Sequence, residues 1–249
     1  GDDITFETSQ TGNLFNIKYP EVTTGDSEYT YLKEYINKVE QVLYNESLFL
    51  DPNEGYKKYC DLESFVDWSL IKELSKDYDA NFFTSCFMNL SDGVLKMGPL
   101  WDFDLAFCNN PFAELFGGFG GGWGGGFGGG TGVDYEYYNE PEGFHVLEAD
   151  WLNRMMLDPE FKSLMRKKID HLIAHEEEIY RYIDEQAALN KYSFISNEYK
   201  WKTLAEQSMW GSGTWNYDEE SLAVYYDKDE IEKMKNFIRD RLRWMQSQF

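Results

Sequence analysis

Four aspartates in two closely spaced pairs are the residues best suited to chemistry in this sequence. Asp77 and Asp79 precede a predicted β-hairpin, and Asp102 and Asp104 directly follow it. Because a hairpin returns the chain to where it began, we expect the two pairs to meet in space. Residues two apart on an extended segment point the same way, so Asp102 and Asp104 are predicted to share a metal ion. Converging carboxylates repel each other unless a cation or proton is present, and Mg²⁺ with bound phosphate is the usual biological solution.

The elements that must position these aspartates are a helix and a hairpin. Apolar residues at three- and four-residue steps predict a helix over residues 62–76, with Asp61 as its N-cap. The hairpin is predicted to have arms at residues 82–88 and 94–100, joined by a turn at Ser91-Asp92-Gly93. The Asp-Gly pair is a strong hairpin signal. Aspartate also commonly caps turns and helices, so a purely structural role for the aspartates stays open.

The rest of the chain predicts an α+β fold that is predominantly helical. Alternating apolar residues indicate a further hairpin over residues 4–19. Helical periodicity recurs along much of the remaining sequence. The predicted helices cover residues 26–45, 149–168, 169–189, 193–210 and 227–249. A length of 249 residues fits one domain, which we assign to residues 1–249.

Composition excludes several classes of partner. The chain carries 45 acidic and 23 basic residues, a formal net charge of -22, which argues against nucleic-acid binding because that affinity depends on Lys and Arg. No apolar run approaches the ~20 residues that a membrane span needs.

The sequence shows no convincing zinc site. The 3 cysteines lack zinc spacing. His171 and His175 have a spacing that can bind zinc, but without a third ligand they indicate a surface pair.

A glycine-rich run occupies residues 117–132, with the sequence GGFGGGWGGGFGGGTG. Glycine at this density predicts a flexible insertion without helix or strand preference. A phosphate-binding glycine loop is the alternative, but such loops join a strand to a helix, and this context is missing here. We therefore assign the run to a surface excursion rather than to a ligand site.

The segment from Glu73 to Asn109 resembles the CotH (spore coat protein H) kinase-like family. The likeness rests on the acidic motif around Asp79, the hairpin, and the stretch Gly98-Pro99-Leu100-Trp101-Asp102-Phe103-Asp104-Leu105-Ala106. It continues in the strand-like opening and in the later stretches WLNR, DPEF and RDRLRWM. The resemblance implies an atypical kinase that uses ATP and Mg²⁺, with a fold like the C-terminal lobe of protein kinases. It also implies an extracytoplasmic or cell-surface location.

Family resemblance also implies roles for the aspartates. Asp79 would be the catalytic aspartate, as a base or as the group that orients the substrate. Asp102 would hold Mg²⁺ on the phosphates of ATP, and Asp104 would be a secondary metal ligand or a group that supports the metal ligands. Phosphoryl transfer needs both kinds of group, a metal that bridges phosphates and a carboxylate near the attacking hydroxyl.

Members of the family carry an N-terminal lobe whose lysine grips the α- and β-phosphates. This chain begins at Gly1 after that lobe, so we expect a truncated C-terminal lobe that is inactive by itself and whose partners are the missing lobe and a protein substrate. Two alternatives stay open. The chain could be an inactive surface or scaffold protein that retains the fold, or a glycan hydrolase that uses a pair of carboxylates.

Overall fold

Helix α2 (Leu62–Ser75) lies at the centre of the protein and is buried on several sides. A computed structural model of the chain describes residues 4–82, 86–109, 136–204 and 216–249. Asp61 caps α2 by accepting a hydrogen bond from the Ser64 N–H, and Lys76 ends it with a left-handed φ of 49°. The predicted helix and its N-cap are therefore confirmed. The glycine-rich run at 117–132 lies outside the described residues.

Two antiparallel hairpins make up the sheet structure of the described residues. The first joins β1 (Ile4–Glu7) to β2 (Leu14–Ile17), with Ile4 opposite Ile17. The second joins β3 (Met88–Ser91) to β4 (Val94–Met97) through a two-residue turn. Both turn residues, Asp92 and Gly93, have positive φ angles of 54° and 74°, as a tight hairpin of this kind requires. Both hairpins are confirmed, but the first arm of the second one is displaced, because β3 covers Met88–Ser91 where the sequence predicts residues 82–88. Its second arm, β4, ends at Met97 rather than at residue 100.

Helices account for most of the remaining structure. The N-terminal half contributes α1 (Ser27–Leu43) and the short η1 (Tyr56–Lys58). The C-terminal half contributes η2 (Glu136–Asn139), η3 (Val146–Glu148), α4 (Asp150–Met155), α5 (Pro159–Ala174), α6 (Glu176–Trp201), α7 (Glu219–Tyr225), η4 (Tyr226–Glu232) and α8 (Lys233–Gln248). The mostly helical α+β class is confirmed.

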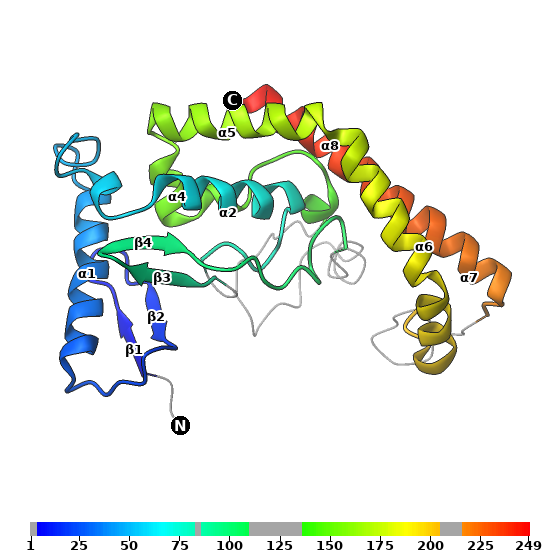
Figure 1. Cartoon of the computed structure of the whole chain (residues 1–249), viewed down its shortest axis with the longest axis horizontal. Coiled ribbons are helices and arrows are strands. Elements are labelled where there is room, and N and C mark those ends of the chain that lie inside the picture. Colours follow the sequence, from blue (N-terminus) through cyan, green and yellow to red (C-terminus); the bar gives the residue numbers. More distant parts are fainter. Residues whose placement is uncertain (1–3, 83–85, 110–135, 205–215) are drawn as a thin grey trace, which may run out of the picture.

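The helix boundaries after residue 149 differ from the prediction in three places. The predicted boundary at 168/169 is wrong, because α5 continues to Ala174 and α6 begins at Glu176. One helix, α6, runs through to Trp201, where the periodicity predicts separate helices over 169–189 and 193–210. The last helical stretch begins at Glu219 rather than near residue 227, and its middle turn, η4, is a π-helix. In Figure 1, α6 and α7 extend from the body as an arm, and α8 leads back from it to pack against α2 and α5.

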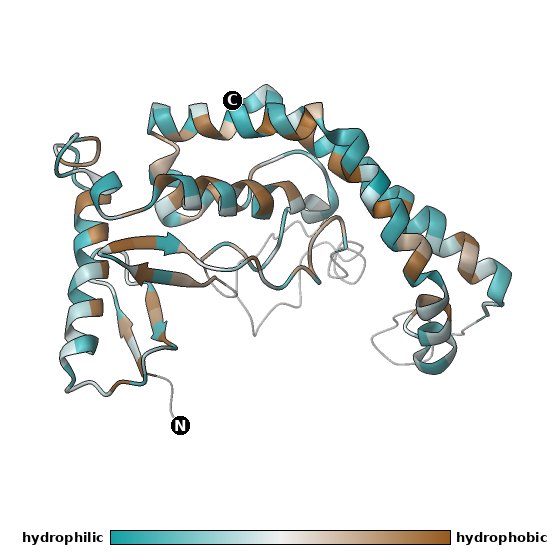
Figure 2. Ribbon diagram, in the orientation of Figure 1, coloured by the Kyte–Doolittle hydropathy of each residue, from teal (hydrophilic) through white to brown (hydrophobic). Residues whose placement is uncertain are grey.

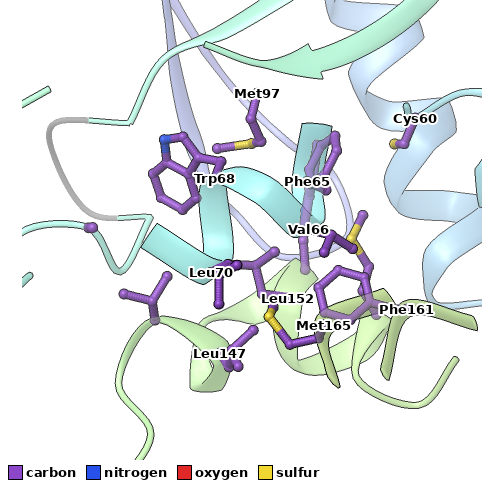
Figure 3. Close-up of a cluster of buried hydrophobic side chains, with 14 of the residues drawn as sticks. Cys60, Phe65, Val66, Trp68, Leu70, Met97, Leu147, Leu152, Phe161 and Met165 are labelled. Carbon is purple, nitrogen blue, oxygen red and sulfur yellow. The ribbon is translucent and has the colours of Figure 1, made fainter. Parts of the chain in front are cut away.

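The core forms where α2 packs against α5, α8, β4 and η3. Figure 3 shows Phe65, Val66, Trp68 and Leu70 of α2 beside Leu147, Leu152, Phe161 and Met165. Apolar residues line α2 and β4, whereas the arm is largely hydrophilic (Figure 2). Burial of these apolar side chains fixes the position of α2. The two segments that carry the aspartate pairs follow directly after α2 and after β4.

Replacing Tyr56 with Phe is expected to lower the free energy of unfolding by roughly 1.5–3 kcal/mol, the range for hydrogen bonds to charged groups. The buried Tyr56 hydroxyl donates to Asp158 at 2.7 Å, and Asp158 also caps α5 by accepting from the Glu160 N–H. Denaturant unfolding measures the change. Tyr31→Phe, whose ring is exposed, is the control and should change stability by less than about 0.5 kcal/mol.

Candidate functional site

The two aspartate-bearing segments lie side by side, as the hairpin predicts. Two backbone hydrogen bonds join them: the Tyr78 N–H donates to the Leu105 carbonyl at 3.2 Å, and the Phe107 N–H donates to the Ser75 carbonyl at 2.7 Å. These bonds link the end of α2 to the segment that follows β4. The carboxylates on the two segments are thereby brought to one region of the surface.

Three of the four aspartates form a group with one another. Asp79 is half-buried, and Asp102 and Asp104 are exposed. Burial raises the pKa of Asp79, and the negative charges of Asp102 and Asp104 raise it further. This repulsion on Asp79 is an electrostatic condition that a bound cation relieves.

Asp77, the fourth aspartate, does not join this group. Its side chain is buried and forms an ion pair with Lys72, and one of its carboxylate oxygens accepts the Asp79 N–H at 3.3 Å. The expectation that both pairs meet in one group is therefore wrong for the Asp77 carboxylate. The first pair divides into one inward-facing aspartate, which supports the loop, and one aspartate near the second pair.

The geometry predicted for the second pair is also wrong. Asp102 has a φ of 62°, in the left-handed region, so the segment after β4 is not extended there. The rule that residues two apart in a strand point the same way does not apply to Asp102 and Asp104. Their proximity to Asp79 arises from a turn in the backbone instead.

The donor set fits Mg²⁺ bound to phosphate. Across the described ranges, no three His, Cys, Asp or Glu side chains are arranged to hold a metal ion by themselves. Mg²⁺ is usually bound by one or two carboxylates, and water and substrate phosphates complete its octahedron. Asp102 and Asp104 would hold the ion, and the repulsion that their charges exert on Asp79 is the feature of this structure that a cation would remove.

Lys72 was missed by the sequence analysis, although it borders the site. Its side chain is 0% exposed, and its ammonium donates to the Asp77 carboxylate and to the carbonyl of Trp101. The ring of Phe103 lies 3.9 Å from the ammonium. One signal in the sequence could have indicated its burial. Helix α2 is apolar on several sides, and such a helix is surrounded by the rest of the protein, so a lysine within it is buried as well.

A second buried ion pair supports the end of α2 from the other side. Glu73 pairs with Arg241 of α8, and its carboxylate accepts the N–H groups of His145 and Leu147 at 3.0 and 2.7 Å. Arg241 also donates to the carbonyls of Pro141 and Gly143. Burial by itself disfavours the charged forms of Glu73 and Arg241. Their mutual attraction and these hydrogen bonds offset that cost.

His145 packs against the loop that carries Asp79. Its Nε2 lies 2.9 Å from the Tyr78 carbonyl, and its ring stacks on Tyr78 at 6.2 Å. Burial lowers its pKa, which favours the neutral ring. The other two histidines, His171 and His175, are exposed on α5 and at its end, in agreement with a surface pair.

No helix formed by the described residues combines the length and apolar character needed to cross a membrane. Comparison with curated proteins and with solved structures finds no match to the chain. The family model described as CotH kinase protein matches residues 6–245, which is nearly the whole chain and includes all of the aspartates discussed above. The chain therefore belongs to the CotH kinase protein family.

Proposed function

We propose that this chain takes part in the Mg²⁺-dependent transfer of a phosphoryl group from ATP to a protein. The observation that supports the proposal is the gathering of Asp79, Asp102 and Asp104 where two segments meet, in a chain of the CotH kinase protein family. Phosphoryl transfer requires little covalent chemistry from the protein and relies on positioning and charge stabilisation, which is what such a group of carboxylates can provide.

Each aspartate has a distinct role in this proposal. Asp79, the most buried of the three, accepts a hydrogen bond from the attacking hydroxyl of the substrate and orients it. Asp102 and Asp104 provide the carboxylate oxygens that hold the metal. When bound, Mg²⁺ would neutralise charge on the phosphoryl group as it is transferred.

We propose further that the cation that grips the phosphates comes from a preceding lobe. Lys72 and Lys76 lie just before Asp77 at the end of α2, but both are fully buried and donate to backbone carbonyls, so neither can reach a phosphate. The net charge of -22 opposes binding of an ATP anion without such a cation. The location proposed for the protein, extracytoplasmic or at the cell surface, rests on family membership alone.

The test is Mg-ATP binding and phosphoryl transfer, measured on the 249-residue chain and on the full-length protein in parallel. Calorimetry should detect Mg-ATP binding by the full-length protein, and γ-labelled ATP should label a protein acceptor. The chain alone should bind weakly or not at all. Micromolar binding by the chain alone would contradict the proposed lobe, and absence of binding by the full-length protein would contradict the proposed kinase function.

Retention of the fold without activity is the competing proposal. The lack, within the described part of the chain, of three side chains arranged as metal ligands favours it. The same binding measurement separates the two, because an inactive scaffold protein would show no Mg²⁺-dependent binding of ATP.

A further inference from the structure

We propose that Lys72 is a positioning residue of this site, whose buried ammonium fixes the turn at Asp102 and so directs the Asp102 and Asp104 carboxylates toward Asp79. The inference rests on the proposed function, since it concerns how the metal-binding side chains are held. Lys72 lies on α2, whereas the residues it would position follow β4. It therefore connects the central helix to the segment of the site with the least regular backbone.

The contacts of Lys72 require a turn in the backbone. Its Nζ donates to the Trp101 carbonyl and lies 3.4 Å from the Asp102 carbonyl. Successive carbonyls of an extended chain point to opposite sides, so one ammonium could not reach both. In a helical turn of either hand they point to one side. The φ of 62° at Asp102 supplies such a turn.

This conformation at Asp102 has to be stabilised by its surroundings. Left-handed φ angles are unfavourable for residues other than glycine, although Asp and Asn tolerate them better than most. Hydrogen bonds from an ammonium are stronger than those between neutral groups, particularly away from water. The buried Lys72 ammonium is thus the group that holds the two carbonyls around Asp102 together.

Lys72 also acts on the Asp79 segment. Its ammonium pairs with one oxygen of the Asp77 carboxylate, and the other oxygen accepts the Asp79 N–H at 3.3 Å. One ion pair therefore joins the loop that carries Asp79 to the turn that carries Asp102. Loss of the ammonium would release both sides of the site at once.

A direct role in binding phosphate does not fit this lysine. An ammonium has three N–H donors, and those of Lys72 point to the Asp77 carboxylate and to the carbonyls of Trp101 and Asp102. The Phe103 ring covers it at 3.9 Å, and no part of the side chain is exposed. Its effect on a bound metal would pass through Asp102 and Asp104.

The test uses the double variant Lys72→Met/Asp77→Asn in the full-length protein. The double change removes the ammonium without leaving a buried carboxylate unpaired, and the Asn carbonyl can still accept the Asp79 N–H. Lys72→Arg keeps a cationic donor. The matched control is Lys76→Met. Lys76 is also buried at the end of α2 and donates to backbone carbonyls, but to those of Tyr137, Glu140 and Glu142.

The first measurement is Mn²⁺ binding by electron paramagnetic resonance. The double variant should bind Mn²⁺ roughly 10- to 100-fold more weakly than the wild type, the range for residues that orient metal ligands. Lys72→Arg should recover most of the affinity, and Lys76→Met should stay close to the wild type. If the folded double variant binds Mn²⁺ as tightly as the wild type, this inference is overturned but the proposed function is not. Absence of binding by the wild type would contradict the proposed function.

The second measurement needs no metal. Amide hydrogen exchange at Phe107 should increase in the double variant, because its N–H bond to the Ser75 carbonyl holds the segment after β4 against α2 and weakens when the Lys72 contacts are lost. In Lys76→Met the increase should instead fall on Glu140, whose N–H donates to the Tyr137 carbonyl that Lys76 binds. Unchanged exchange at Phe107 in the double variant would overturn the inference, whatever the result with Mn²⁺.

Discussion

Asp102→Asn should lower Mg²⁺-dependent phosphoryl transfer by the full-length protein by about 10³-fold, which corresponds to the several kcal/mol that a catalytic metal contributes. The amide keeps the shape of the side chain but is a weaker ligand for a hard cation. The fold should be unaffected, because Asp102 is exposed and Asn tolerates its φ of 62°. Initial rates with γ-labelled ATP over a range of Mg²⁺ concentrations measure the loss.

Asp92→Asn is the matched control for this experiment. Asp92 is also exposed and has a φ of 54°, but it lies in the turn between β3 and β4, at the far end of the hairpin from the site. Its replacement by Asn should leave the rate unchanged. A normal rate for Asp102→Asn would rule out Asp102 as the metal ligand, and an equal loss in both variants would indicate a general effect of charge.

Arg241→Met should lower the free energy of unfolding by about 3–5 kcal/mol, the range for breaking one side of a buried ion pair. The substitution leaves the Glu73 carboxylate buried without its cation and removes the donor to the carbonyls of Pro141 and Gly143. Burial already raises the pKa of Glu73, and loss of the guanidinium raises it further. Denaturant unfolding followed by circular dichroism measures the change.

Arg239→Met provides the comparison on the same helix. Arg239 is exposed and pairs with the neighbouring Asp240 at 3.0 Å, so its removal should leave the denaturation midpoint close to that of the wild type. A loss of less than about 1 kcal/mol in Arg241→Met would mean that Glu73 takes up a proton readily when its partner is removed.

Elements with local signals were predicted well from the sequence. Asp61 marked the start of α2, and Asp92-Gly93 marked the hairpin turn. In each case the signal comes from residues within a few positions of the element, through a capping hydrogen bond or a preferred φ angle. The break between α5 and α6 at His175 has no glycine or proline, so its position could not be predicted.

The site was predicted less well, because its geometry depends on contacts between distant residues. The return of the hairpin correctly brought Asp79 near Asp102 and Asp104, but the left-handed turn at Asp102 depends on Lys72, which lies on another element. Lysine is ordinarily exposed, and nothing beside it in sequence indicated an ion pair with Asp77. Similarly, no local pattern relates Glu73 to Arg241.

The separation between Glu73 and Arg241 has a consequence for synthesis of the protein. The two residues lie 168 positions apart, so Glu73 emerges from the ribosome long before its cation does. Until α8 follows, α2 cannot bury that carboxylate in its charged form without a large penalty. We therefore expect the nascent chain to leave α2 incompletely packed, with apolar surface open to chaperones, and to complete the region around Asp79 only after Arg241 has been translated.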